Sequence, residues 1–180
     1  MEPRKGFVVF LTGLPAAGKS SLAEKLKTLL EDRQGRIVTW LDGDQIRTWL
    51  SNGLGFTKED RDMNVVRVGK VAAEIARHGG AVVISLVSPY REARDQVRAL
   101  VQAVGKFIEV HVSTPLSVCE ARDPKGLYAR GRRGEAKGVT GLDAPYESPL
   151  KPDLVLDGSK GTPDQEAEAI LSLLREARCL

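Results

Sequence analysis

The segment Gly13–Ser20, GLPAAGKS, is the part of the sequence whose residue types and spacing most directly indicate chemistry. It matches the pattern G-x-x-x-x-G-K-[ST] of a phosphate-binding loop. The glycines let the backbone fold around an anion, so that successive N–H groups and a helix N-terminus face phosphate oxygens. Lys19 is expected to reach the β- and γ-phosphates of a nucleotide, and Ser20 is expected to ligate Mg²⁺. A turn that only joins a strand to a helix is disfavoured, because the full motif lies between a predicted strand and a predicted helix.

The phosphate-binding loop predicts a nucleotide site, but GTPases, motor proteins and small-molecule kinases all share it. The predicted ATP-binding residues in and beside the loop are Gly13, Leu14, Pro15, Ala16, Ala17, Gly18, Lys19, Ser20 and Ser21. The guanine-reading sequence N-K-x-D of GTPases is absent, and a mechanical ATPase is normally longer than 180 residues. These absences favour a small-molecule kinase that uses ATP with Mg²⁺.

Two acids, Asp42 and Asp44, follow the second predicted strand in the sequence LDGD. An acid at the carboxyl end of a parallel strand lies at the crevice where ligands bind. The pair can hold the metal through water, which we assign to Asp42, or orient an acceptor hydroxyl, which we assign to Asp44. The alternative is structural, with Asp44 capping the next short helix and Asp42 making a turn. Arg47, one helical turn beyond Asp44, favours a site.

The elements that must position these residues alternate along the chain. Strands are predicted over residues 7–12, 37–41, 81–87, 106–112 and 153–156. Helices are predicted over residues 19–30, 45–50, 57–78, 89–104, 116–121 and 163–178. This alternation predicts an α/β protein with the P-loop NTPase fold, in which helices cover both faces of a five-stranded parallel sheet.

The overall composition is that of an ordinary globular protein, and a single domain over residues 1–180 is expected. The net charge of +3 is mild and does not by itself argue for nucleic-acid binding, so no nucleic-acid partner is expected. The apolar run near the N-terminus, about six residues, is too short for a signal peptide or a membrane span. Two cysteines provide no disulfide framework, so a cytoplasmic location is expected.

Several segments together resemble one family, the adenylylsulfate kinases, over about residues 7–157. The segments are TGLPAAGKSS, LDGDQIR, LGFTKEDRDMN, SLVSPYREAR, EVHVSTPLSVCEARDPKGLY and TGLDAPYESP. The resemblance implies phosphorylation of the 3′-hydroxyl of adenosine 5′-phosphosulfate (APS) by ATP, which gives PAPS. It also implies a fold like that of the nucleoside monophosphate kinases, with a mobile lid, and a homodimer. A functional association with ATP sulfurylase is a further expectation.

An APS pocket needs cations for the phosphosulfate and a surface on which the adenine can stack. Arg47 and Arg61 lie at the starts of the two helices after the second strand, and a guanidinium group suits sulfate or phosphate. Phe56 precedes a helix cap, but a hydrophobic staple is poorly served by Arg61 and Asp62, which favours stacking on adenine. Asn64, about one turn further, can read the base or the sugar. The resemblance places Arg47, Phe56, Arg61 and Asn64 at positions that touch APS.

The segment 122–149 is rich in glycine, proline and charge, and it is too long for a simple connection. We expect residues 122–140 to form the lid, with Arg122 at the ATP site and cations over the transferring phosphoryl group. The resemblance places Lys125 against APS. For Arg132 and Arg133, a solvated surface loop is an equally good interpretation.

Ser88 and Pro89 make a good helix N-cap and first helical residue. The resemblance also places a phosphoserine intermediate of the family at Ser88. Direct transfer needs only the residues already named, so the main expectation is that Val87, Ser88 and Pro89 line the APS pocket. Arg91 is expected to support that pocket or a dimer.

Val139 departs from the family pattern, which usually has phenylalanine there, covering the second face of the APS adenine. Valine offers less surface and no π-system, so weaker APS binding or weaker substrate inhibition is expected. The predicted catalytic residues are Lys19, Asp42, Asp44 and Ser88, and the predicted metal ligands are Ser20 and Asp42.

Two other functions remain open from the residues alone. One is a P-loop kinase for another nucleotide or a small alcohol, although the acceptor-side arginines and Phe56 weigh against a neutral alcohol. The other is a non-catalytic nucleotide-binding module, such as one half of an ATP sulfurylase partnership. The presence of Lys19, Ser20, Asp42 and Asp44 argues against such a module.

Overall fold

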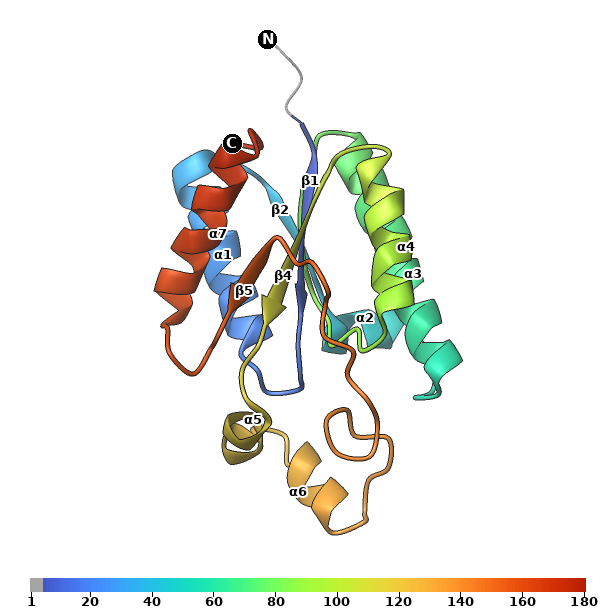
Figure 1. The fold of residues 1–180 in the computed structure, drawn as a ribbon. Coiled ribbons are helices and arrows are strands. Elements are labelled where there is room, and N and C mark those ends of the chain that lie inside the picture. The colour runs from blue at the N-terminus through green and yellow to red at the C-terminus, as the bar shows by residue number, and fades with distance from the viewer. Residues whose placement is uncertain (1–4) are drawn as a thin grey trace.

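The computed structural model describes residues 5–180, which form one five-stranded parallel sheet between helical layers (Figure 1). The strand order is β2-β3-β1-β4-β5, so β1 and the loop that follows it lie at the centre. The strands are β1 (Phe7–Thr12), β2 (Val38–Asp42), β3 (Ala81–Ser85), β4 (Lys106–Val112) and β5 (Leu154–Leu156). The predicted α/β fold with five parallel strands is confirmed.

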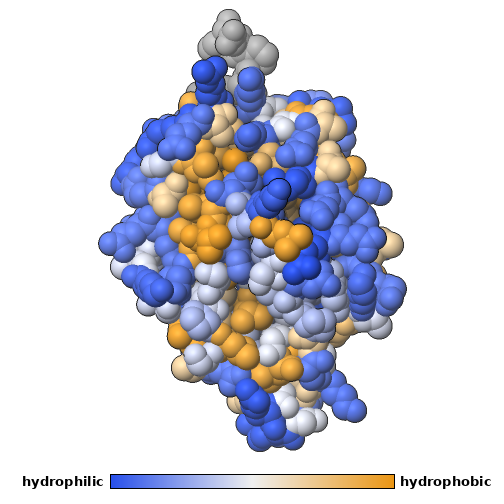
Figure 2. All heavy atoms as spheres, viewed as in Figure 1, coloured by the Kyte–Doolittle hydropathy of each residue, from blue (hydrophilic) through white to orange (hydrophobic). Residues whose placement is uncertain are grey.

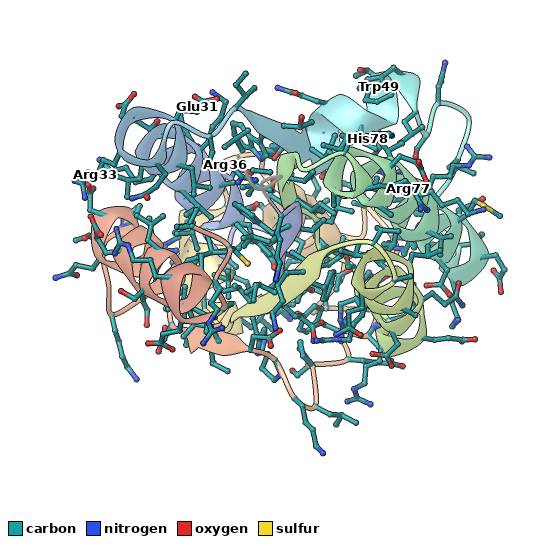
Figure 3. The ribbon with its side chains drawn as sticks, turned by 90° about the horizontal axis from the view of Figure 1, so that it is seen from above. Glu31, Arg33, Arg36, Trp49, Arg77 and His78 are labelled. Carbon is teal, nitrogen blue, oxygen red and sulfur yellow. The ribbon has the colours of Figure 1, made fainter. Side chains whose placement is uncertain are left out.

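Long helices cover both faces of the sheet, as the view from above shows (Figure 3). One layer holds α1 (Lys19–Gln34) and α7 (Pro163–Glu176), and the other holds α3 (Lys58–Arg77) and α4 (Arg91–Gln102). Three short helices lie toward the carboxyl ends of the strands, namely α2 (Gly43–Trp49), α5 (Leu116–Arg122) and α6 (Leu127–Arg132). The loops at that edge therefore carry the polar residues singled out in the sequence.

The core consists of two apolar layers, one on each face of the sheet. Because side chains alternate along a strand, Phe7, Val9 and Leu11 pack with α1 and α7, while Val8 and Phe10 pack toward α3 and α4. All five side chains are fully buried. A strand covered on both faces reads as a continuous apolar run, which is why FVVFLT predicted β1 with the correct ends.

The predicted ends of other elements were less accurate. The strand β3 ends at Ser85 rather than Val87, and α4 begins at Arg91 rather than Pro89. The helix α6 was not predicted, because its six residues carry little apolar periodicity. The caps were predicted better, since Thr57 and Thr162 accept hydrogen bonds from Asp60 N and Gln165 N.

At the amino-terminal edge of the sheet, Arg36 ties three segments together (Figure 3). Its guanidinium group donates to the carbonyl oxygens of Lys5 and Gly79, at 3.1 and 2.9 Å, and lies over the Phe7 ring. These contacts connect the segments at this edge of the sheet to one another.

The face shown in Figure 2 is mostly hydrophilic, with separate hydrophobic patches. Within residues 5–180, no helix combines the length and the apolar character needed to cross a bilayer. Cys119 and Cys179 are both buried and unbonded to each other.

Candidate active site

A cavity of about 1010 Å³ lies at the carboxyl edge of the sheet and brings the predicted site residues together. Its lining includes the phosphate-binding loop, the ends of β2 and β3, and the starts of α3 and α7. Every residue predicted to bind ATP, APS or metal lines it except Gly13 and Leu14. Drug-sized ligands typically occupy cavities of about 300–1,000 Å³, so this one is large enough for more than a single small ligand.

The phosphate-binding loop takes its shape from two left-handed residues, Ala16 (φ 60°) and Gly18 (φ 106°), before α1 begins. Gly13 lies behind the loop, where a Cβ would be 2.4 Å from the carbonyl oxygen of Val112. The first glycine of the motif is therefore required by close packing against β4, which explains why it does not line the cavity.

Lys19 is held in place by its own loop. Its Nζ donates to the carbonyl oxygens of Gly13, at 2.9 Å, and Leu14, at 2.7 Å. Burial lowers the pKa of Lys19 to about 8, against the attraction of nearby anionic groups including Asp42 and Asp44. A triphosphate in the loop would favour the ammonium form and raise this pKa again.

ATP binding is therefore expected to take up protons near pH 8 and to weaken above it. Free Lys19 is increasingly neutral above its pKa of about 8, so the apparent Kd for ATP should rise by up to about tenfold per pH unit. Calorimetry in buffers of different ionisation enthalpy, from pH 7 to 9.5, measures both effects. Lys19→Arg is the control, because its guanidinium group stays charged across this range. Parallel pH profiles for the two proteins would contradict the assignment.

Asp42 ends β2 and connects three elements. Its Oδ2 accepts from Ser20 Oγ at 2.9 Å and from Ser85 Oγ at 2.8 Å, while its Oδ1 accepts from Asp44 N at 3.1 Å. Asp42 is thus the N-cap of α2. The structural alternative assigned that cap to Asp44 and was wrong on this point. Ser85, at the end of β3, also accepts from Trp40 Nε1 and was missed in the sequence.

Asp44 and Lys125 form an ion pair within the cavity. Asp44 belongs to α2, whereas Lys125 belongs to the segment between α5 and α6, so the pair joins two separate walls. Both side chains are more than half exposed, and each can exchange its partner for a ligand group.

The ring of Phe56 lies close to both arginines expected to bind the phosphosulfate. The guanidinium carbons of Arg47 and Arg61 lie 4.5 and 5.6 Å from the centre of its ring. Arg61 also donates to Phe56 O, Thr140 Oγ1 and Gly138 O, so it joins the start of α3 to the segment 138–140. Arg47 makes only long contacts, of 3.3 and 3.5 Å, to main-chain oxygens. Arg47 is thus the arginine with more capacity for a ligand anion.

Three residues that line the cavity each carry a buried polar atom with no hydrogen-bond partner within residues 5–180: Asn64 Oδ1, Ser88 Oγ and Glu166 Oε1. Such atoms are rare in folded proteins, and each indicates a ligand, an ion or water. Asn64 and Ser88 were predicted as APS contacts. Glu166 was not predicted, because a lone acid in the first turns of a helix is also what favourable helix electrostatics would place there.

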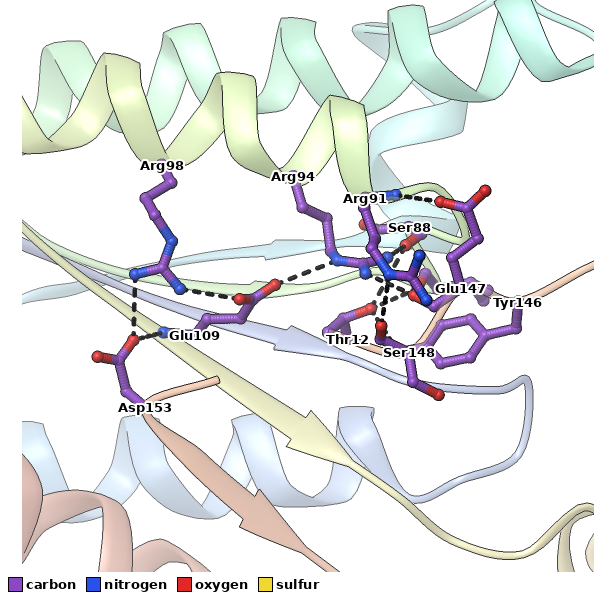
Figure 4. Close-up of polar contacts among 11 residues, drawn as sticks. Thr12, Ser88, Arg91, Arg94, Arg98, Glu109, Tyr146, Glu147, Ser148 and Asp153 are labelled. Carbon is purple, nitrogen blue, oxygen red and sulfur yellow. Dashed lines mark hydrogen bonds and ion pairs between the residues drawn. The ribbon is translucent and has the colours of Figure 1, made fainter. Parts of the chain in front are cut away.

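Ser88 does not cap α4, contrary to the prediction. The cap position is Tyr90, which makes no side-chain capping bond, and Ser88 is held outside the helix with φ 46°. Contacts with distant parts of the chain hold Ser88 in this conformation. Arg94 Nη1 donates to Ser88 O at 2.5 Å (Figure 4), and Thr12 Oγ1 donates to Val87 O at 2.7 Å. These contacts fix the loop through its main chain and leave the buried Ser88 hydroxyl without a hydrogen-bond partner within residues 5–180.

Arg94 is the centre of a buried network behind that loop (Figure 4). It is 2 % exposed and also donates to Glu147 O and, through Nε, to Glu109 Oε1 at 3.1 Å. Arg98 completes the pairing of Glu109, at 2.8 Å. Arg91 binds Ser148 O and, through its main-chain N–H, the Glu147 carboxylate, so it fixes the segment 147–148 and does not line the cavity.

The sequence profile of adenylylsulphate kinase matches residues 5–157. The chain belongs to the adenylylsulphate kinase family. The adenylyl-sulfate kinase of Microcystis aeruginosa is 51% identical over 151 residues, which cover 84% of this chain and 81% of that protein. The structure of the Mycobacterium tuberculosis APS kinase CysC in complex with AMPPNP and APS has a TM-score of 0.91 and 39% identity, covering 96% of this chain and 99% of that one.

Another relative is much longer. The sulfate adenylyltransferase of Neosartorya fischeri is 47% identical over 171 residues, which cover 94% of this chain but only 30% of that protein. The chain thus spans less than a third of the length of this fungal relative.

In this member of the adenylylsulphate kinase family, the cations of the segment 122–140 divide into two groups. Arg122, Lys125, Arg130 and Lys137 line the cavity. Arg132 and Arg133 do not, and they form surface ion pairs with Glu120 and Glu135. For these last two, the interpretation as a solvated surface is the correct one.

Val139 lines the cavity but is only 2 % exposed. It packs closely on α6, where a Cβ on Gly131 would lie 3.1 Å from it. Its main-chain N–H and that of Gly138 both donate to the Asp143 carboxylate, which fixes this turn. Little of the valine side chain is therefore available to a base.

Proposed function

We propose that the protein transfers the γ-phosphoryl group of ATP to the 3′-hydroxyl of APS, giving PAPS and ADP. The observation that carries the proposal is that one cavity contains both the phosphate-binding loop and a second set of ligand-seeking groups. We call this second set the acceptor arm, and its residues are Asp44, Arg47, Phe56, Arg61, Asn64 and residues 87–89. A cation, an aromatic ring and two unpartnered polar atoms suit a nucleotide that carries a charged phosphosulfate. The related Mycobacterium protein, which holds AMPPNP and APS together, supports the same assignment.

In the proposed mechanism, the 3′-oxygen of APS attacks the γ-phosphorus in line, and the bond to the bridging oxygen of ADP breaks. The hydroxyl proton passes to the Asp44 carboxylate, which is released from Lys125 as the acceptor enters. Lys19 stabilises the charge on the β- and γ-phosphates, and Lys125 turns to the acceptor. Ser88 acts as a pocket residue, and no covalent intermediate on it is needed.

Ser20 and Asp42 fit a Mg²⁺ site. Their oxygens lie 2.9 Å apart beside the loop, and Mg²⁺ is usually bound by one or two such groups together with waters and substrate phosphates. When bound, the ion would neutralise negative charge on the phosphates.

Residues 122–140 are proposed as the lid, because they supply four cavity-lining cations from outside the sheet. The similarity to part of the Neosartorya sulfate adenylyltransferase supports a functional association with ATP sulfurylase. The homodimer and the cytoplasmic location remain expectations from the sequence.

The proposed function is tested by incubating the protein with ATP, Mg²⁺ and APS and following PAPS by chromatography. We expect PAPS and ADP in equal amounts, and no product with Lys19→Met. Parallel reactions with AMP and with simple sugars test the other kinase functions. If AMP or a sugar is phosphorylated faster than APS, that compound replaces APS as the assigned substrate. ATP binding without any ADP release would indicate a non-catalytic module.

A further inference from the structure

The end of the cavity opposite the acceptor arm is built from residues that the sequence analysis did not connect. We call it the donor arm, and its residues are Arg122, Gly158, Gly161, Pro163 and Glu166. The acceptor arm comes mainly from α2 and α3, whereas the donor arm includes the start of α7, in the helix layer on the other face of the sheet. The phosphate-binding loop lies between these layers, at the centre of the sheet.

The donor arm is packed directly against the phosphate-binding loop. Arg122 donates to Gly158 O at 2.5 Å and to Ala17 O at 3.4 Å. A Cβ on Gly158 would lie only 2.8 Å from Ala17 O, so the turn at 158 touches the loop backbone. With the acceptor arm on the α2 and α3 side, the donor arm is the part of the cavity left for the base of a nucleotide whose phosphates occupy the loop.

Glu166 is the polar side chain that the start of α7 directs into the donor arm. Thr162 and Gln165 form a reciprocal capping box, with Pro163 as the first helical residue, so the direction of this turn is fixed. Glu166 lines the cavity and is 8 % exposed, and its buried Oε1 has no hydrogen-bond partner within residues 5–180. A Cβ on Gly161 would lie 3.2 Å from Glu166 Cγ, so a larger residue there would displace the acid.

Contacts within residues 5–180 leave one oxygen of the Glu166 carboxyl group buried and unpaired. Burial raises the pKa of Glu166, and Arg122 only partly opposes that shift. The two side chains do not form an ion pair within 4 Å in the part of the chain that the structure describes. A buried acceptor without a partner destabilises the fold, and a hydrogen-bond donor on a ligand would offset that cost.

We propose that Glu166 reads the base of the phosphoryl-donor nucleotide by accepting a hydrogen bond from the 6-amino group of adenine. This inference rests on the proposed use of ATP and adds the residue that selects it. Guanine and hypoxanthine present an oxygen at the same position, so two acceptors would face each other and those bases would bind less well.

The test measures Kd for two nucleotides without APS: ATP, and purine riboside 5′-triphosphate, which lacks only the 6-amino group. We expect the unmodified protein to prefer ATP by about tenfold, and Glu166→Ala to bind the two within about twofold of each other. Glu166→Gln should keep an intermediate preference, because its amide oxygen still accepts. Glu176→Ala, the same change at an exposed acid at the end of α7, should keep the full preference.

An equal ATP preference in Glu166→Ala and the unmodified protein would overturn the proposal, as would no preference in the unmodified protein. The ratio of two Kd values for one variant cancels any loss of folded protein, and Glu166→Gln supplies a second, milder change. Because APS is not present, failure of APS as the acceptor and failure of Glu166 as the base reader are distinguishable.

Discussion

Asp44→Asn is expected to lower kcat with APS by about 10²–10⁴-fold while the Kd for ATP changes little. Asparagine keeps the size of the side chain but cannot accept the proton of the 3′-hydroxyl. ATP binding should persist, because the loop contacts of Lys19 and the Asp42–Ser20 hydrogen bond do not involve Asp44. Steady-state turnover together with calorimetric titration of ATP measures the two effects separately.

Lys125→Met is the matched control for that experiment, because it breaks the same ion pair from the other side. If Asp44 takes the proton, Lys125→Met should mainly raise the KM for APS and reduce kcat much less than Asp44→Asn. Near-normal turnover in Asp44→Asn, or equal kcat losses in the two variants, would remove Asp44 from the role of base.

Arg94→Met is expected to lower the free energy of unfolding by about 3–5 kcal/mol. The change keeps the length of the side chain but removes donors to Ser88 O, Glu147 O and Glu109. It leaves Glu109, itself 5 % exposed, with a buried charge that only Arg98 and the surrounding dipoles compensate. Urea denaturation followed by circular dichroism measures the loss.

The control for Arg94 is Arg77→Met, which removes an exposed arginine paired with Glu74 at the end of α3. Exposed pairs contribute about 0–1 kcal/mol, so this variant should unfold almost as the unmodified protein does. Similar losses in both variants would show that the network around Arg94 stabilises the protein no more than a surface pair.

The sequence predicted the elements whose signals are local. The predicted ends of β1 and β4 were correct, with a continuous apolar run defining β1, and the threonine caps defined the starts of α3 and α7. The phosphate-binding loop and the acids after β2 were also recognisable, because their spacing along the chain is itself the signal. Each of these features can be predicted from residues that are close together in the sequence.

The features that were missed depend on contacts between distant parts of the chain. Ser88 was predicted as a cap because the sequence SPYRE favours one, but Arg94 and the end of β1 hold that loop in another conformation. Ser85 gains its importance from Asp42 on the neighbouring strand. Glu166 became visible only as a buried atom without a partner, a property that no residue spacing reveals.

The unpartnered atoms of Asn64, Ser88 and Glu166 imply a compromise between ligand affinity and the stability of the fold. Leaving such an atom unpaired costs on the order of 1–3 kcal/mol, a sizeable fraction of the 5–15 kcal/mol typical of a domain. Apolar substitutes at these positions would give a more robust but less discriminating protein. A substrate group that pairs with one of these atoms would therefore contribute to affinity and to stability at the same time.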